Sequence, residues 1–319
     1  MKAVILESHA IQAGDLCWDA LKPLVDELVV YPHTPQGQVV ERLAGAQLVI
    51  LNKSRIDEAV LAQCPALRWA GLIATGYDNI DLDACRRHGV LVANAPGYST
   101  HSVAQYAFAL LLAACQSVDR MDPAVRDGCW KQMGPQYGVR PLTELYGKTF
   151  GIVGYGDIGR EAARIARGFG MRVLACTRTI RPAYAQDGTE FTALETLMEQ
   201  SDVISLHCPM TPETAQLINA DTLRHVKPGA ILINTARGGL VEDEAVAAAC
   251  RDGRLAYYLA DVAAKEPIEA GSPLLTVPNT ILTPHVAWAT GAALHNLQEI
   301  VIQNLRSFLA GSPEHIVNR

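Results

Sequence analysis

The chain lacks several features that mark whole classes of protein. None of its eight cysteines forms a Cys-x-x-Cys pair, so the sequence predicts neither a zinc ribbon nor a redox dithiol. The net charge of −6 gives no broad basic surface for nucleic acid or anionic lipid. No uncharged apolar run reaches membrane-spanning length, and the start of the chain turns polar at Glu7, unlike a signal peptide. We therefore expect a cytoplasmic protein that contacts neither membrane nor nucleic acid and holds no metal.

Short apolar runs alternate with segments of helical periodicity along most of the 319 residues. This alternation predicts an α/β protein whose parallel sheets are covered by helices, and the length allows two domains. The first series of expected strands comprises residues 3–6, 28–31, 48–51, 69–74 and 91–94. The second comprises residues 150–153, 172–177, 203–207, 230–234, 258–261 and 281–283. Helices are expected at residues 36–43, 58–63, 102–118, 158–169, 192–200, 221–226, 243–251 and 292–309.

The order of these segments predicts a discontinuous first domain. The helix at 102–118 leads into the second series of strands, and the helix at 292–309 can return to pack on the first. We predict a substrate domain of residues 1–100 with 285–319 and a dinucleotide-binding domain of residues 101–284. Residues 120–145, rich in Gly, Pro and Trp, do not fit the alternation. They form either an arm that contacts a partner subunit or an ordinary surface excursion.

The most informative motif is Gly154-Tyr155-Gly156-Asp157-Ile158-Gly159, which stands between an expected strand and an expected helix. In a dinucleotide site the first glycine makes the tight turn, the second lets backbone approach the pyrophosphate, and the third lets helix and strand pack closely. The N-terminus of the following helix then offers N–H groups to the phosphates. The alternative is an ordinary strand-to-helix turn that happens to contain glycines. The context favours the dinucleotide site.

The second strand of this unit lacks the acid that usually binds the ribose 2′-OH of NAD. No Asp or Glu occurs between Ala162 and Gln186, whereas five arginines do. Arginine and threonine would remove the repulsion of a 2′-phosphate and donate hydrogen bonds to it. We therefore predict a preference for NADP(H), with NAD(H) as the alternative if the arginines are only solvated surface residues. The residues expected near the phosphate are Thr177, Arg178, Thr179 and Arg181.

Three polar residues follow expected strands of the second series, where ligands bind in open α/β sheets. They are Arg237, Glu266 and His285. Reduction of a ketone by hydride needs a proton donor, and His serves near neutral pH. A neighbouring Glu would orient the imidazole, and an Arg could bind a substrate carboxylate. Taken singly, each of these residue types is more often structural.

At these residues the chain resembles the D-isomer-specific 2-hydroxyacid dehydrogenases, nearly from end to end. Glycerate dehydrogenases, also called hydroxypyruvate reductases, are the branch that it resembles most, through Asn52-Lys53, the Pro96–Gln105 segment and the Pro284–Ala289 segment. The motifs that carry the family resemblance are Gly154-x-Gly156-x-x-Gly159, Asn234-Thr235-Ala236-Arg237-Gly238, Asp261-Val262, Glu266-Pro267, Pro284-His285 and Ala74-Thr75-Gly76-Tyr77-Asp78-Asn79-Ile80-Asp81.

The resemblance implies two doubly wound parallel-sheet domains, with a Rossmann NAD(P)-binding domain inserted into a flavodoxin-like substrate domain, and a homodimer. It implies that Arg237 binds substrate, that His285 is the acid/base and that Glu266 tunes it. Asp261 would contact the nicotinamide carboxamide. The residues implied to line the nucleotide site are Cys208, Pro209, Thr214, Thr235 and Ala236. The residues implied or proposed to bind substrate are Lys53, Thr75, Gly76, Tyr77, Arg237 and Trp288. Trp288 either lines the substrate pocket or packs between domains or subunits.

The resulting expectation is NADPH-dependent reduction of a small 2-oxo acid, hydroxypyruvate or glyoxylate, to the D-2-hydroxy acid. Two alternatives stay open at this point. One is a related dehydrogenase for another acceptor, such as phosphite or a bulkier oxo acid. The other is a non-catalytic NAD(H)-binding interaction protein, similar to corepressors that share the fold.

Overall fold

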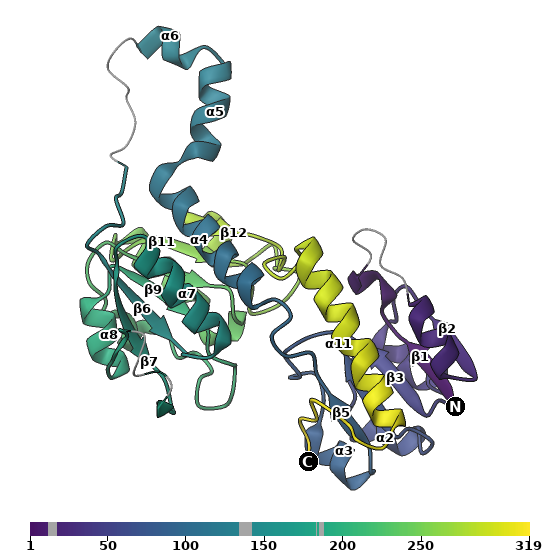
Figure 1. Ribbon diagram of the computed structural model, residues 1–319. Coiled ribbons are helices and arrows are strands. Elements are labelled where there is room, and N and C mark those ends of the chain that lie inside the picture. The colour runs from purple at the N-terminus through teal and green to yellow at the C-terminus, as the bar shows by residue number, and fades with distance from the viewer. Residues whose placement is uncertain (12–17, 134–141, 183, 185–187) are drawn as a thin grey trace. The chain divides into compact units, whose positions relative to one another are not determined.

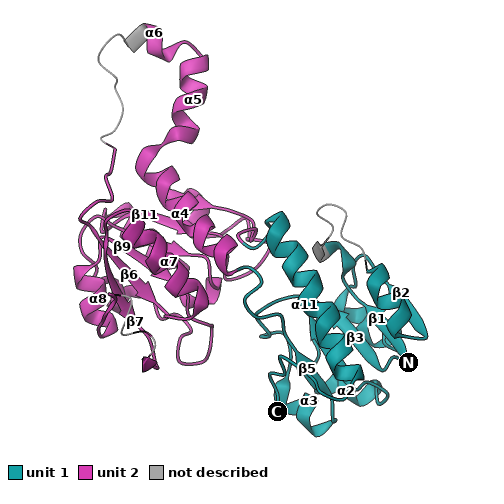
Figure 2. Ribbon diagram, in the orientation of Figure 1, with its two compact units in different colours: residues 1–99, 288–319 teal, residues 100–287 magenta. Residues whose placement is uncertain are grey.

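The computed structural model describes residues 1–11, 18–133, 142–182, 184 and 188–319. The chain forms two compact units (Figure 1 and Figure 2). Residues 1–99 and 288–319 make the first unit, and residues 100–287 make the second. Both ends of the chain therefore contribute to the first unit.

The first unit is built on a five-stranded parallel sheet with the order β2-β1-β3-β4-β5. Its strands are β1 (Lys2–Ile5), β2 (Glu27–Val30), β3 (Leu48–Leu51), β4 (Trp69–Leu72) and β5 (Leu91–Ala93). The central strands β3 and β4 are buried along their whole length, which is why they read as unbroken apolar runs. This strand order is that of flavodoxin-like folds, so the predicted fold class is confirmed here.

Helices cover both faces of this sheet (Figure 1). On one face lie α1 (Val39–Arg42), α2 (Glu58–Gln63) and α3 (Leu82–Arg87), and on the other lie α11 (Gly291–Leu309) and η2 (Asp19–Leu24). The shorter 3-10 helices are η1 (Ser8–Ile11) and η3 (Gln36–Gln38). Asp57 and Asp81 cap α2 and α3 by accepting hydrogen bonds from backbone N–H groups in their first turns.

The second unit is built on a seven-stranded parallel sheet with the order β12-β11-β10-β9-β6-β7-β8. Its strands are β6 (Thr149–Val153), β7 (Arg172–Cys176), β8 (Glu190–Phe191), β9 (Val203–Leu206), β10 (Ala230–Asn234), β11 (Leu255–Ala260) and β12 (Thr280–Leu282). Counted from β6, this is the Rossmann order with one further edge strand. The order reverses between β6 and β9, which is the point where such sheets bind their ligands.

The helices of the second unit also lie on both faces of its sheet (Figure 1). On one face are α4 (Thr100–Gln116) and α7 (Asp157–Gly168), and on the other are α8 (Leu194–Gln200), α9 (Ala220–Leu223) and α10 (Asp243–Arg251). The remaining elements are α5 (Val118–Arg126), α6 (Cys129–Met133), η5 (Gly238–Leu240) and η6 (Pro273–Thr276). In the described part of the chain, no helix is both long and apolar enough to cross a membrane.

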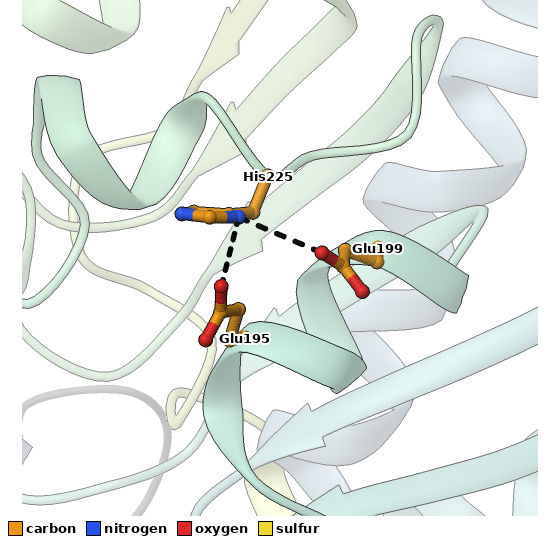
Figure 3. Close-up of side chains that lie close together, drawn as sticks. All are labelled: Glu195, Glu199 and His225. Atoms are coloured by element: carbon orange, nitrogen blue, oxygen red, sulfur yellow. Dashed lines mark ion pairs between the residues drawn. The ribbon is translucent and has the colours of Figure 1, made fainter.

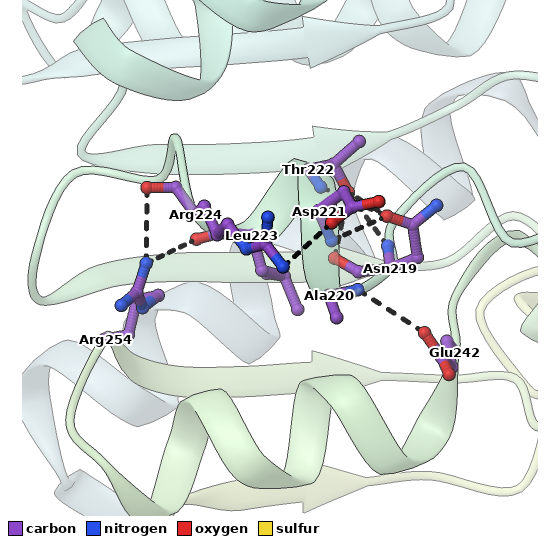
Figure 4. Close-up of polar contacts among 8 residues, drawn as sticks. All are labelled: Asn219, Ala220, Asp221, Thr222, Leu223, Arg224, Glu242 and Arg254. Atoms are coloured by element: carbon purple, nitrogen blue, oxygen red, sulfur yellow. Dashed lines mark hydrogen bonds and ion pairs between the residues drawn. The ribbon is translucent and has the colours of Figure 1, made fainter.

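The segment before α9 shows how local sequence starts and stops a helix (Figure 4). The Asn219 side chain accepts a hydrogen bond from Thr222 N at 3.1 Å, and the Thr222 hydroxyl accepts one from Asn219 N at 2.8 Å. This reciprocal pair is a capping box. At the other end the Arg254 guanidinium donates to the carbonyls of Leu223 and Arg224, which ties the end of α9 to the start of β11.

Several elements were not predicted from the sequence. α3 directly follows the motif at residues 74–81, and β8 is a two-residue strand on the edge of the sheet. The segment at 120–145 contains most of α5 and all of α6, and its residues 134–141 lie outside the described residues. These elements are too short, or too polar, for apolar periodicity to mark them.

The chain passes between the units at two places. The first division falls one residue before the predicted boundary, and the second falls three residues after it, so residues 285–287 belong to the second unit. The reason is a set of hydrogen bonds within that unit. The backbone N–H groups of Val286 and Ala287 donate to the Asp261 carboxylate, and the Ala287 carbonyl accepts from the Ser102 hydroxyl.

Candidate active site

The glycine turn after β6 is shaped by close backbone contacts that leave no room for a side chain at two of its three glycines. Gly154 has φ +97°, and a Cβ there would lie 2.4 Å from Cys208 N. A Cβ on Gly159 would lie 2.3 Å from Gly154 O. Gly156 is different, since no other described atom would lie within 4 Å of its Cβ. The first and third glycines are thus required by packing, whereas the second leaves the turn open.

The turn leads into the N-terminus of α7, which begins at Asp157 with Gly156 as its N-cap. No described side chain caps this end, so its N–H groups are positioned to bind an anion. The Tyr155 side chain is 1% exposed, and its hydroxyl lies 2.6 Å from Thr189 Oγ1. Its side chain faces the core, so contact with a cofactor would use its backbone. Ile158 is half-buried.

The loops that follow β9 and β10 lie at the same end of the sheet as this turn. The Thr214 hydroxyl donates to Pro209 O at 2.7 Å and accepts from Thr211 N, which closes the loop after β9. Thr235 follows β10, and its buried hydroxyl has no hydrogen-bond partner among the described residues. A buried hydroxyl without a partner is unfavourable unless a ligand or water satisfies it. The open turn, the uncapped helix and this hydroxyl together fit a bound dinucleotide.

Two titratable groups at the switch point are kept neutral by burial. Burial lowers the pKa of His207 to about 4, and its Nε2 lies 2.9 Å from the Ser205 hydroxyl. Burial also raises the pKa of the Cys208 thiol to about 11. Neither group therefore changes charge near neutral pH, which leaves the acid/base chemistry to other residues.

The residues expected near a 2′-phosphate lie at and just beyond the end of β7, where Arg178, Thr179 and Arg181 are exposed. An acid that sequence reasoning missed interacts electrostatically with Arg178. A hydrogen bond with Thr211 lowers the pKa of Glu213, and the charge of Arg178 contributes in the same direction. Glu213 comes from the loop after β9, so a search confined to residues after β7 could not find it. Its negative charge therefore interacts with one of the expected phosphate contacts.

Glu266 and His285 are brought into direct contact by the loops after β11 and β12. His285 Nδ1 lies 2.9 Å from Glu266 Oε1 and 2.8 Å from Oε2, and both side chains are under a third exposed. The carboxylate thereby orients the ring and favours a proton on Nδ1. Proton exchange with a substrate would then use Nε2. This pair can act as a general acid or base.

Arg237 stands at the end of β10, in a turn organised by the buried side chain of Asn234. The Asn234 amide donates to Arg237 O at 2.9 Å, and its oxygen accepts from Ala236 N at 3.1 Å. Gly238 then passes so close to the segment carrying Glu266 that a Cβ would lie 1.9 Å from the Ala263 carbonyl carbon. The Arg237 turn and the Glu266 loop are therefore packed backbone against backbone.

Asp261, expected at the nicotinamide carboxamide, is fully buried. Its Oδ1 accepts from the Thr283 hydroxyl at 2.6 Å and from Val286 N at 3.0 Å, and its Oδ2 accepts from Ala287 N at 2.7 Å. The carboxylate thus lies beneath the His285 loop.

The substrate residues predicted on the first unit include Lys53, whose loop is held by a buried acid. The Glu7 carboxylate, in a residue only 2% exposed, accepts from Asn52 N at 2.7 Å and Ser54 N at 2.6 Å. The Asn79 amide donates to the carbonyls of the same two residues, at 3.1 and 2.7 Å. Lys53 is therefore presented from a loop fixed on both sides. Sequence reasoning missed Glu7, which is far from Lys53 along the chain.

The other predicted substrate loop, residues 75–77, follows β4. Thr75 is anchored at its hydroxyl, which donates to Ala95 O at 2.8 Å, and at its carbonyl, which accepts from the Asn94 amide at 2.7 Å. Gly76 is half-buried and Tyr77 is exposed. Trp288 is half-buried and packs against the apolar cluster under α11.

An exposed group elsewhere on the second unit also combines His with Glu (Figure 3). His225 Nδ1 lies 3.3 Å from Glu195 Oε1 and 3.6 Å from Glu199 Oε1. All three side chains are exposed, so we assign them as a surface ion-pair cluster that ties the end of α9 to α8.

Comparison with known proteins gives the family. The family model for the D-isomer specific 2-hydroxyacid dehydrogenase NAD binding domain matches residues 108–287, more than half of the chain. The chain belongs to this family. It is 38% identical to a hydroxypyruvate reductase of Blautia hydrogenotrophica over all of both chains, and 39% identical to a glyoxylate reductase of Thermococcus litoralis over 89% of this chain and 87% of that one.

Solved structures agree with the family assignment. An acyclic imino acid reductase in complex with NADPH and D-Arg has a TM-score of 0.88 and 27% identity, over 99% of this chain and 100% of that one. D-Lactate dehydrogenase of Aquifex aeolicus, complexed with NAD and lactic acid, has a TM-score of 0.85 and 28% identity, over 100% and 99%. The second unit is thus the NAD-binding domain of a D-2-hydroxyacid dehydrogenase, and the protein is an oxidoreductase.

Two glycine variants test the cofactor turn, each serving as the control of the other. Gly156→Ala is expected to fold normally, because φ at this position is −82° and the added Cβ would meet no described atom. The same variant is expected to weaken NADPH and NADH binding at least about tenfold, because the methyl group fills the space through which the backbone approaches the pyrophosphate. Gly154→Ala is expected to lower the unfolding temperature, because φ is +97° and its Cβ meets backbone. Titration calorimetry and thermal unfolding measure the two effects. Undiminished cofactor binding by Gly156→Ala would place the phosphates elsewhere.

Proposed function

We propose that the protein reduces a small 2-oxo acid, hydroxypyruvate or glyoxylate, to the D-2-hydroxy acid, with NADPH as the preferred reductant. The observation that carries this proposal is the contact of His285 with the Glu266 carboxylate in the unit that contains the glycine turn. Reductases of hydroxypyruvate and glyoxylate among the relatives support the choice of substrate.

In this proposal the bound NADPH supplies the hydride, and the chain's own residues manage the carboxylate and the proton. The Arg237 guanidinium binds the substrate carboxylate and polarises the ketone. His285 donates its Nε2 proton to the forming alkoxide while Glu266 holds Nδ1. The family resemblance implies further substrate contacts by Lys53 and by the backbone N–H groups of residues 75–77. Cys208, Pro209, Thr214, Thr235, Ala236 and the glycine turn hold the nucleotide.

Replacing the proton donor tests the reaction directly. His285→Ala is expected to lower kcat for hydroxypyruvate or glyoxylate by at least about 10³-fold, because no other group then protonates the alkoxide. The assay follows NADPH oxidation with a panel of 2-oxo acids. His225→Ala is the matched control, since it removes an exposed histidine of the same unit. Near-normal turnover by His285→Ala would assign the proton to another group.

The preference for NADPH rests on the basic residues after β7. Thr177, Arg178, Thr179 and Arg181 supply donors for a 2′-phosphate, whereas Glu213 opposes it. Solved relatives hold NADPH in one case and NAD in another, so the fold accommodates both cofactors. The balance between Arg178 and Glu213 therefore sets the strength of the preference.

Opposite substitutions at these two positions measure that balance. Arg178→Ala is expected to lower kcat/KM for NADPH about tenfold with little change for NADH, because only NADPH carries the 2′-phosphate. Glu213→Gln is expected to raise kcat/KM for NADPH, because it removes a repelling charge. Arg172→Ala, an exposed arginine at the start of β7, is the control. A wild-type enzyme that prefers NADH, or equal losses for both cofactors in Arg178→Ala, would contradict the proposal.

We also propose that the protein is a homodimer joined by residues of the segment that contains α5 and α6. No residue of α5 is buried, and the exposed fractions of Val118, Val125 and Trp130 are 67%, 45% and 59%. α5 and α6 extend away from the sheet of the second unit (Figure 1). Exposed apolar side chains on these two helices favour association, and a second copy of the chain offers the same side chains.

A charge placed on this segment tests the dimer. Val125→Glu is expected to convert a dimer into a monomer, because the carboxylate would be buried without a partner in the interface. Light scattering during size-exclusion chromatography gives the mass. Leu275→Glu is the control, because Leu275 is 49% exposed on η6, outside the segment. A monomeric wild type, or a dimer that survives Val125→Glu, contradicts this interface.

A further inference from the structure

The backbone at the proton donor adopts a conformation that needs support. His285 has φ +57°, in the left-handed region, and its N–H donates to Thr283 O at 3.0 Å in a tight turn. A side chain with a Cβ is disfavoured in this region, so the conformation persists only where surrounding contacts impose it. Residues 283–287 are here called the His285 turn. What holds this turn also determines where the imidazole points.

One buried carboxylate supports the turn from both sides of His285. Asp261 Oδ1 accepts from the Thr283 hydroxyl, two residues before His285, and from Val286 N, one residue after it. Oδ2 accepts from Ala287 N, two residues after it. The carboxylate is fully buried, and hydrogen bonds to an ionised acceptor are stronger than those between neutral groups.

A second buried group holds the same turn from another element. The Ser102 hydroxyl, in the first turn of α4, donates to Ala287 O at 2.5 Å. Ser102 is 8% exposed and Ala287 is 3% exposed. Both polar groups of the Ala287 backbone are therefore engaged, the N–H by Asp261 and the carbonyl by Ser102.

We propose that Asp261 and Ser102 are positioning residues that hold the His285 turn in its left-handed conformation and so keep the imidazole on Glu266. This inference rests on the proposed function, in which His285 is the proton donor. Three donors of the turn bind the Asp261 carboxylate, so the role proposed here is separate from the carboxamide contact that the family resemblance implies. Asn at position 261 would present an NH₂ group toward at least one of these donors.

The kinetic test compares Asp261→Asn with His285→Ala, alone and combined. Asp261→Asn is expected to lower kcat about 10²-fold, because misplacing a catalytic group lowers the reaction rate by about that factor. KM for the oxo acid and Kd for NADPH are expected to change less than about twofold. In the His285→Ala background Asp261→Asn is expected to add no further loss, because it acts through His285. Weaker NADPH binding with kcat preserved, or an added loss in the double variant, overturns the proposal.

The Ser102 variants test the same turn without touching the carboxylate. Ser102→Ala is expected to lower kcat about fivefold to tenfold through loss of one buried hydrogen bond, and Ser102→Thr, which keeps the hydroxyl, is expected to restore it. Ser201→Ala is the control, because Ser201 is a fully buried serine of the same unit outside the turn. These variants also carry the test if Asp261→Asn does not fold. Wild-type kcat in Ser102→Ala, or no recovery in Ser102→Thr, overturns the role of Ser102.

Hydrogen exchange measures the stability of the His285 turn independently of catalytic activity. Exchange of the Val286 and Ala287 N–H groups, followed by mass spectrometry in the full-length protein, is expected to be at least about tenfold faster in Asp261→Asn and Ser102→Ala than in wild type or Ser201→Ala. Unchanged exchange overturns the proposal even if the wild type proves inactive. If the wild type reduces no 2-oxo acid, the proposed function fails while this measurement still decides whether Asp261 and Ser102 hold the turn.

Discussion

The backbone after β6 lies against the backbone after β9, and the organisation of the second unit depends on this contact. Only glycine fits at position 154, because the Cys208 backbone fills the space where a Cβ would stand. The same turn directs the chain into α7 with an uncapped N-terminus. Since β6 and β9 are the strands between which the order reverses, this contact also marks where a nucleotide can lie.

The proposed acid/base chemistry depends on the parallel direction of the neighbouring strands. β10, β11 and β12 all end at the same edge of the sheet, so the loops carrying Arg237, Glu266 and His285 meet there although their residues are far apart in the chain. Close backbone packing at Gly238, a hydrogen bond donated by the Asn234 amide and hydrogen bonds accepted by the Asp261 carboxylate then hold these loops. The charged side chains of the candidate site therefore stand on loops that are held by close backbone packing and by buried polar side chains.

Sequence patterns predicted the fold class and the family, because buried parallel strands read as apolar runs and because the glycine motif needs a strand before it and a helix after it. The expected strand at 48–51 and the helix at 58–63 coincide with β3 and α2. The supporting residues could not be predicted in this way. Glu7, Ser102 and Glu213 act on residues that are near in space and distant in the chain, and no local pattern marks such a pairing. Tyr155 shows a related limit: it lies within the glycine motif, but the motif alone does not indicate that its side chain packs into the core.

The discontinuous first unit has a consequence for the order in which the chain can fold during synthesis. One face of its sheet, including Ile5, Ile50 and Trp69, is covered by Leu297, Val301 and other residues of α11. The ribosome must make all of residues 100–287 between β5 and α11. At ordinary elongation rates this takes roughly ten seconds or more, during which the second unit can complete its own core while the first exposes an apolar sheet face. Nascent chains of this protein therefore pass through a stage at which an apolar surface of the first sheet is open to chaperones.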